Sequence, residues 1–236
     1  MKDFKKEFTL FLNKLKSNEN FSLSRFGDGE LAIIKNSFID FSNKCNGEHI
    51  FLPEKHEKYH ILMKESLKYK SENYFVGISC KCCVEEQDHI YYKKISDQNE
   101  SHLTFATIFV NSNYKLFLEK FIPELKNKEI VLVSHEKSDI SKLPFKVQKH
   151  FKIGANAWIN NFDMIYEISN YSKTVKNKVF LFAAGTFSNI AIHECHKNSK
   201  DNTYIDVGST LDIILGLGAT RRYLRGKNTI NKTCVW

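Results

Sequence analysis

The segment that most constrains the fold lies late in the chain, where two apolar strands flank one helix. Residues 179–185 read Val-Phe-Leu-Phe-Ala-Ala-Gly, a helical stretch spans about 188–196, and residues 204–208 read Tyr-Ile-Asp-Val-Gly. An apolar strand, a glycine turn, a helix and a second strand predict a βαβ unit. Its strands are parallel and need cover on both faces, so helices must pack on both sides of the sheet.

The rest of the chain continues this alternation. A stripe of phenylalanines predicts an amphipathic helix over 3–16, and alternating residues over 21–26 predict a strand. Further helices are expected around 59–67, 117–121 and 162–168, and further strands at 74–79, 130–134 and near Phe151. The polar stretch 80–101 shows little periodicity, and we expect it to cover part of the fold. The prediction is α/β: a Rossmann-like, doubly wound, mostly parallel sheet with helices on both faces.

Length and composition favour a single domain over residues 1–236, with the helix 3–16 packed on it. The chain is 42% apolar and holds only ten glycines and three prolines, which excludes disordered and collagen-like classes. No stretch approaches the roughly 18 apolar residues of a membrane span, and the first residues do not resemble a signal peptide. We therefore expect a cytoplasmic protein whose six cysteines are reduced thiols.

The formal net charge of +8 could indicate a polyanionic partner. A solvated lysine-rich surface is the more ordinary cause, and the phenylalanines fall on core stripes of helices, so we expect no nucleic-acid partner. The charge could instead attract an anionic donor molecule or an anionic membrane, and a peripheral membrane contact stays open. The oligomeric state stays open as well.

The first candidate site follows the strand 21–26, where Arg25 precedes Gly27-Asp28-Gly29-Glu30. Two glycines let a ligand approach the backbone closely, and two carboxylates leave the same turn. Mg²⁺ and Mn²⁺ take oxygen ligands, usually one or two carboxylates plus substrate phosphates, so a metal site at Asp28 and Glu30 is one interpretation. The other is helix capping, with Asp28 as the N-cap and Glu30 as a favourable charge in the first turn.

The second candidate site is the turn Gly185-Thr186-Phe187-Ser188-Asn189 between a buried strand and a helix. Backbone N–H groups and the helix dipole hold phosphate in such a setting. Asp206 follows Gly185 by 21 residues, near the spacing at which an acidic residue meets a ribose hydroxyl in dinucleotide folds. Because Gly-x-Gly-x-x-Gly is absent, the pattern indicates a nucleotide but not specifically NAD. A simple turn, with Asp206 capping a strand end, is the alternative.

Three further groups are weaker candidates. The first group is Cys80, Cys82 and Cys83 with His89, which could bind zinc. Because a second spaced pair of Cys or His ligands is missing, the favoured interpretation is that these cysteines are thiols of the core or of a loop. The stretch 135–139, His-Glu-Lys-Ser-Asp, offers a general base or only a solvated loop. Arg221, Arg222 and Arg225 could face a diphosphate or solvent.

The stretch Ser24-Arg25-Phe26-Gly27-Asp28-Gly29-Glu30 resembles the GT-D-fold glycosyltransferases, a family first catalogued as a domain of unknown function. Residues 154–158, 184–186 and 204–208 continue the resemblance in the expected order. It implies an inverting, metal-assisted transfer of sugar from a nucleotide-diphosphate sugar, with UDP as the expected nucleotide, to a hydroxyl of a glycan or glycolipid. Members often carry His where this chain has Ser209, so the acceptor and the base do not carry over.

With the resemblance, the expected site has three sets of residues. The catalytic candidates are Asp28, Glu30, Asp139 and Asp212, with Glu136 also open as the base, and Asp28 and Glu30 are the expected ligands of Mn²⁺ or Mg²⁺. The expected nucleotide-sugar contacts are Arg25, Gly27, Gly29, Asn156, Gly185, Thr186, Ser188, Asn189, Asp206, Gly208 and Ser209. Two rival functions stay open: another nucleotide-cofactor enzyme such as a methyltransferase, and a non-catalytic nucleic-acid-binding protein.

Overall fold

The structure, a computed structural model, describes residues 2–40, 50–225 and 233–236. Its central sheet has seven strands, all parallel, in the order β5-β4-β1-β9-β8-β6-β7. The strands are β1 (Ser22–Phe26), β4 (Tyr74–Ile78), β5 (Leu103–Phe105), β6 (Ile130–His135), β7 (Val147–Ile153), β8 (Val179–Ala183) and β9 (Thr203–Asp206). Two short strands, β2 (Ile39–Asp40) and β3 (Ile50–Phe51), form a separate antiparallel pair. The predicted parallel α/β sheet is confirmed.

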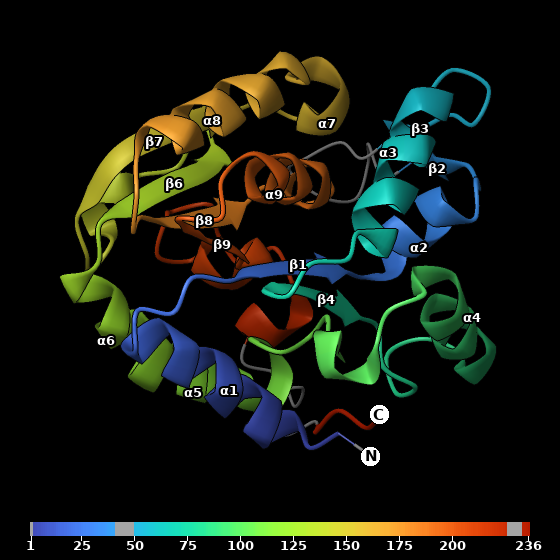
Figure 1. Cartoon of the computed structure of the whole chain (residues 1–236), viewed down its shortest axis with the longest axis horizontal. Coiled ribbons are helices and arrows are strands. Elements are labelled where there is room, and N and C mark those ends of the chain that lie inside the picture. The colour runs from blue at the N-terminus through green and yellow to red at the C-terminus, as the bar shows by residue number, and fades with distance from the viewer. Residues whose placement is uncertain (1, 41–49, 226–232) are drawn as a thin grey trace.

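Helices cover both faces of the sheet (Figure 1). They are α1 (Phe4–Lys16), α2 (Asp28–Ile34), α3 (Glu57–Lys68), α4 (Glu86–Ser96), α5 (Tyr114–Leu116), α6 (Ile122–Glu124), α7 (Ala157–Asn160), α8 (Asp163–Thr174) and α9 (Phe187–Asn198). A π-helical turn, Phe117–Phe121, joins α5 to α6. Within the described ranges, no helix has the length and apolar character needed to cross a membrane.

Neighbouring residues of the inner strands enter opposite cores, as continuous apolar strands require. In β8, Phe180 and Phe182 pack in the core under α2, α3, α8 and α9, whereas Val179 and Leu181 pack in the core under α1 and α6. The side chain of Asp3 caps α1 and accepts hydrogen bonds from two backbone N–H groups. The apolar stripe of α1 is buried against the second core, with Phe4 5.0 Å from Phe105 between ring centroids.

The stretch 80–101 differs from its prediction, because it contains the helix α4. The inward face of α4 is formed by His89, Tyr92 and Ser96, which are buried. Their spacing is helical, but none is strongly apolar, so hydropathy alone does not reveal the period. The short strand β5 and the β2–β3 pair also escape prediction, since two or three residues carry no periodicity.

The order of the strands positions the site. From β1 the chain moves outward to β4 and β5, crosses to β6 and β7, and returns through β8 to β9 beside β1. The loops after β1 and β9 therefore leave neighbouring strands at the same edge. In open parallel sheets, ligands bind at the carboxyl edge where the direction of winding changes.

Candidate active site

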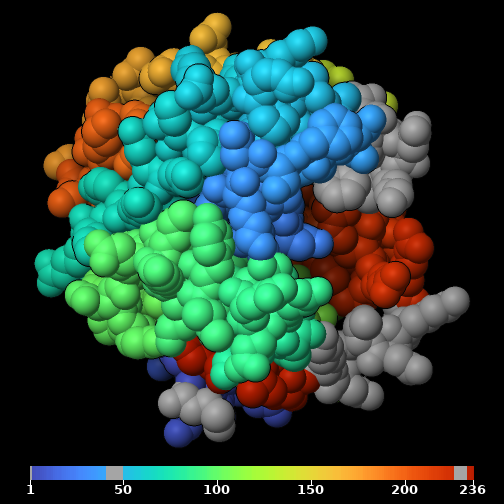
Figure 2. Space-filling view, turned by 90° about the vertical axis from the view of Figure 1, so that its right-hand side faces the viewer, coloured from blue at the N-terminus to red at the C-terminus, as the bar shows by residue number. Residues whose placement is uncertain are grey.

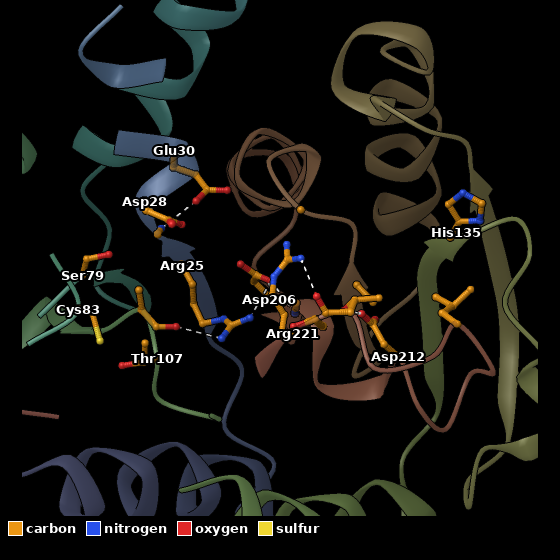
Figure 3. A pocket seen from close by; sticks show the side chains of 18 residues that line it. Arg25, Asp28, Glu30, Ser79, Cys83, Thr107, His135, Asp206, Asp212 and Arg221 are labelled. Carbon is orange, nitrogen blue, oxygen red and sulfur yellow. Dashed lines mark hydrogen bonds and ion pairs between the residues drawn. The ribbon is translucent and has the colours of Figure 1, made fainter. Parts of the chain in front are cut away.

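A cavity of about 430 Å³ opens at the carboxyl edge of the sheet, and we call it the edge cavity. It is lined by the ends of β1, β4, β5, β6, β8 and β9 or by the loops that follow them. Segments coloured blue, green and red meet at this edge in Figure 2, and Figure 3 shows the side chains inside. The lining groups include two arginines and four carboxylates: Arg25, Arg221, Asp28, Glu30, Asp206 and Asp212.

A buried ion pair joins β1 to β9 in this cavity. Nη2 of Arg25 lies 3.3 Å from Oδ1 of Asp206, and the two side chains are only 9% and 7% exposed. The second amino group of Arg25, Nη1, donates to the carbonyl oxygen of Ala106 at 3.0 Å. Oδ1 of Asp206 also accepts from the backbone N–H of Gly208 at 2.8 Å. Burial raises the pKa of Asp206, and the charge of Arg25 opposes that rise.

The start of α2 combines a helix cap with two carboxylates. Gly27 is the N-cap, and Oε2 of Glu30 accepts a hydrogen bond from its N–H at 2.8 Å. Oδ1 of the exposed Asp28 accepts from the N–H of Gly29 at 3.0 Å. The capping interpretation is therefore wrong about the N-cap, because Gly27 and not Asp28 occupies that position. Its other part is confirmed, since Glu30 lies in the first turn, where its side chain accepts a hydrogen bond from the N-cap.

Glu30 is unusually hard to ionise for a glutamate. Burial raises its pKa to about 7, the nearby charges of Asp206 and Asp28 add to the rise, and the hydrogen bond from Gly27 opposes it. Glu30 is thus a carboxyl group that changes its charge near neutral pH. Perturbed carboxyl groups in a cleft are characteristic of functional sites.

Asp212 is a second perturbed carboxyl group in the same cavity. It follows the 3₁₀ turn Gly208–Leu211, and its side chain accepts a hydrogen bond from the hydroxyl of Thr220. Burial raises its pKa to about 6, while the bond from Thr220 and the charge of Arg221 oppose that rise. A carboxylate with this pKa is suited to remove a proton near neutral pH.

A second cavity, of about 550 Å³, adjoins the first, and we call it the arginine cavity. The two share Asp28, Glu30, Gly185, Thr220 and Arg221, and the second also meets Arg222, Arg225 and Thr186. Thr186 is the N-cap of α9 and is 5% exposed. Its Oγ1 has no hydrogen-bond partner among the described residues. A helix N-terminus, a buried hydroxyl and arginines together favour a phosphate.

Comparisons with known proteins support the same fold. One similar solved structure is described as a new glycosyltransferase (DUF1792) from Streptococcus sanguinis. Its TM-score is 0.60 and its sequence identity is 14%, and the superposition covers 91% of this chain and 85% of the solved chain. A second solved structure is described as the domain of unknown function 1792 with a distinct glycosyltransferase fold. It has a TM-score of 0.57 and 17% identity, and the superposition covers 91% of this chain and 82% of the solved chain. The chain has the DUF1792 glycosyltransferase fold. No family model matches its sequence, and no curated protein matches it.

Within this DUF1792 fold, three of the residues predicted to contact the nucleotide sugar are not among the lining residues of either cavity and instead hold neighbouring elements in place. Asn189 is buried, and its Nδ2 donates to the carbonyl oxygen of Arg25 at 2.9 Å, which ties α9 to β1. Ser188 is buried beside it. Asn156 has φ 49° and accepts a 2.6 Å hydrogen bond from Nε1 of Trp158, a residue that lines the arginine cavity.

The other predicted residues divide between the cavities and the surface. Gly27, Gly208 and Ser209 line the edge cavity, and Oγ of Ser209 lies 2.8 Å from the hydroxyl oxygen of Tyr223. Gly29 lines the arginine cavity. Asp139 is not among the lining residues of either cavity, and hydrogen bonds from Ser141, together with Lys142, lower its pKa.

Sequence reasoning missed several residues that line the edge cavity. Ser79 follows β4, and Thr107 follows β5, on the opposite side of β1 from β9. Thr220 reaches Asp212 from a loop without any motif. The polar residue that ends the predicted strand 74–79 was an available signal for Ser79, because carboxyl ends of parallel strands meet at one edge. Thr107 carried no such signal, since its strand was not predicted.

Proposed function

We propose that the chain is a glycosyltransferase that moves a sugar from a nucleotide-diphosphate sugar, with UDP as the expected nucleotide, to a hydroxyl of a glycan or glycolipid. The anomeric carbon is inverted. The observation that carries the proposal is the edge cavity, where four carboxylates and two arginines converge at the carboxyl edge of a parallel sheet. The glycosyltransferase fold of the similar structures supports the same class of reaction.

The two adjoining cavities suit a donor that carries a diphosphate between a sugar and a nucleoside. Their volumes, about 430 and 550 Å³, fall within the usual range for small-molecule sites. The N-terminus of α9, Thr186 and the guanidinium groups of Arg222 and Arg225 supply hydrogen-bond donors for phosphate oxygens. Gly185, which both cavities share, leaves the backbone accessible there.

Asp28 and Glu30 are the proposed ligands of Mn²⁺ or Mg²⁺. The charges of Asp28 and Asp206 oppose the ionisation of Glu30, and a cation beside them would relieve this repulsion. Two carboxylates are the usual protein share of such a site, with the diphosphate and water completing the shell. When bound, the cation would neutralise charge that develops on the departing diphosphate.

Asp212 is the proposed general base. The acceptor oxygen forms a bond to the anomeric carbon while the carboxylate of Asp212 takes the hydroxyl proton. The bond from that carbon to the phosphate oxygen breaks, and its electron pair leaves with the nucleoside diphosphate. Asp212 lines the edge cavity with a pKa of about 6, whereas Asp139 has a lowered pKa and lines neither cavity.

The buried pair of Arg25 and Asp206 positions the donor. Oδ1 of Asp206 accepts hydrogen bonds from the backbone N–H of Gly208 and from the guanidinium group of Arg25, and these bonds fix the carboxylate at the cavity wall. We assign it contacts with ribose or sugar hydroxyls. The reaction needs no nucleic-acid partner, and we place it in the cytoplasm, where nucleotide sugars are available.

A panel of nucleotide sugars tests this function. The assay measures release of nucleoside diphosphate with Mn²⁺, with Mg²⁺ and with a chelator, for the wild type and Asp28→Asn. The matched control is Asp201→Asn, an exposed aspartate whose carboxylate lies 2.8 Å from Nζ of Lys176. We expect metal-dependent release that falls by about 100-fold in Asp28→Asn and is unchanged in the control. Absence of nucleoside diphosphate release from every donor would contradict the function, and equal turnover in Asp28→Asn would contradict the metal site.

A further inference from the structure

Four cysteines converge beside the edge cavity, and one of them comes from a distant part of the sequence. The sulfur atoms of Cys80, Cys82, Cys83 and Cys234 all lie within 4.8 Å of one another. Sγ of Cys80 is 3.1 Å from Sγ of Cys82, and Sγ of Cys83 is 3.9 Å from Sγ of Cys234. The fold therefore supplies the additional ligand that the local motif lacks, 151 residues after Cys83.

The three local cysteines lie on a tight turn between β4 and α4. Cys80 and Cys83 have the C-x-x-C spacing, and the N–H of Cys83 donates to the carbonyl oxygen of Cys80 at 2.9 Å. The N–H of Val84 donates to the same oxygen at 3.2 Å. Turns of this kind bring two sulfur atoms to one side, which is how structural zinc sites gather paired thiolates.

The fourth cysteine is held in place by its own contacts. Oγ1 of Thr107 lies 3.1 Å from Sγ of Cys234, and Nδ2 of Asn111 donates to that sulfur at 3.5 Å. Two residues later, the ring of Trp236 packs edge-on against His89 and Phe105, with centroids 5.1 Å apart in each case. Polar groups that donate to sulfur stabilise a thiolate and orient it toward a metal.

We propose that these four thiolates bind one structural Zn²⁺ ion. Tetrahedral zinc with Zn–S bonds of about 2.3 Å holds its sulfur atoms about 3.8 Å apart. The separations in the cluster lie on both sides of that value, from 3.1 Å between Cys80 and Cys82 to 3.9 Å between Cys83 and Cys234, and all four sulfur atoms lie within 4.8 Å of one another. Thiolate ligands bind Mg²⁺, Ca²⁺ and Mn²⁺ poorly compared with Zn²⁺, so the cysteine site selects a different metal from the carboxylates of α2. His89 is not one of the four, because its ring nitrogens are not among the ligand atoms that lie within 4.8 Å of one another.

Zinc here would connect two segments that are far apart in the sequence. It would join the segment 233–236 to the turn after β4. Cys83 and Thr107 also line the edge cavity, so the metal would stiffen one wall of that cavity (Figure 3). Structural zinc contributes directly to folding stability, because the ligands are not preassembled in the unfolded chain. The proposal does not depend on the reaction carried out in the cavity.

Metal content and cobalt spectroscopy test the site in the full-length chain. We expect one zinc per chain in wild-type protein purified under reducing conditions. Replacing zinc with Co²⁺ should produce visible bands of tetrahedral coordination and near-ultraviolet thiolate-to-cobalt bands. Bound metal should also protect Cys80, Cys82, Cys83 and Cys234 from alkylation, as read by mass spectrometry of the labelled peptides.

Three single variants complete the experiment. Cys83→Ser and Cys234→Ser should lose most of the zinc and the sulfur-to-cobalt bands, whereas Cys195→Ala, which removes a buried thiol of α9 outside the cluster, should retain both. If the two cluster variants do not fold, the wild-type spectra and alkylation pattern decide. Wild-type protein that takes up neither metal, gives no sulfur-to-cobalt bands, or forms a Cys83–Cys234 disulfide in reducing buffer would overturn the proposal.

Discussion

The guanidinium group of Arg25 occupies the space that a side chain at position 208 would need. A Cβ added to Gly208 would overlap Nη2 of Arg25, and Gly208 has φ +51°, a left-handed conformation that favours glycine. The N–H of the same glycine donates to Oδ1 of Asp206. Gly208 thus allows the loop after β9 to pass directly over the buried ion pair that joins the two central strands.

Gly208→Ala should therefore destabilise the protein more than an ordinary glycine replacement. Gly218→Ala is the matched control, because Gly218 also has a positive φ, of 83°, but no atom within 4 Å of an added Cβ. Both variants incur the left-handed cost of about 1 kcal/mol, and Gly208→Ala should lose a further ~1–3 kcal/mol of unfolding free energy by displacing Arg25. Urea unfolding measures both, and equal losses would contradict the steric relationship.

Removing one partner of the Arg25–Asp206 pair should cost more than removing both. Arg25→Met leaves a buried carboxylate without its cation and should lower the unfolding free energy by ~3–5 kcal/mol. Adding Asp206→Asn removes the unpaired charge and should restore part of that loss. A double-mutant cycle by urea unfolding gives the coupling energy, and simple additivity of the two losses would show that the pair is not coupled.

Glu30 should make the stability of the protein fall as pH rises toward neutrality. Its folded pKa of about 7 is above the ordinary value of 4.5, so between these values the folded state binds more protons than the unfolded state. The unfolding free energy contributed by Glu30 is complete below about 4.5 and is lost as pH rises through about 7. In metal-free buffer, Glu30→Gln should flatten this part of the curve, and Glu119→Gln, an exposed control, should not.

The same carboxyl group should make metal affinity depend on pH. If Glu30 is a metal ligand as proposed, the cation binds its ionised form. The dissociation constant for Mn²⁺ should then fall as pH rises, by about tenfold per unit below pH 7, and level off above the pKa of about 7. Calorimetric titration at several pH values checks this. A dissociation constant independent of pH, or one unchanged in Asp28→Asn, would argue against metal ligation by this turn.

Asp212→Asn should lower kcat by about 100-fold to 10,000-fold, because it removes the proposed base for the acceptor hydroxyl. In the wild type, activity should rise with pH through about 6, where Asp212 ionises. Thr220→Val should move this limb to higher pH, since the hydroxyl of Thr220 lowers the pKa of Asp212. If Asp139 is the base instead, the larger loss will appear in Asp139→Asn.

Local sequence patterns predicted most of the strands whose ends carry the site, but not β5, which precedes Thr107. The apolar runs of β6, β8 and β9 and the glycine turns at Gly27 and Gly185 predicted a parallel sheet with polar loops at one edge. They did not predict α4, whose buried face is made of His89, Tyr92 and Ser96. The periodicity of such a helix appears only when the tertiary structure shows which side is covered.

The sequence by itself determined the local conformations and the types of chemical group available, because periodicity, glycine positions and charge are properties of neighbouring residues. Tertiary structure decided which groups meet. It paired Arg25 with an aspartate 181 residues later, brought Cys234 to the turn after β4, and buried Glu30 and Asp212 far enough to raise their pKa values. Contact and desolvation depend on distances between remote segments, and those distances exist only in the folded chain.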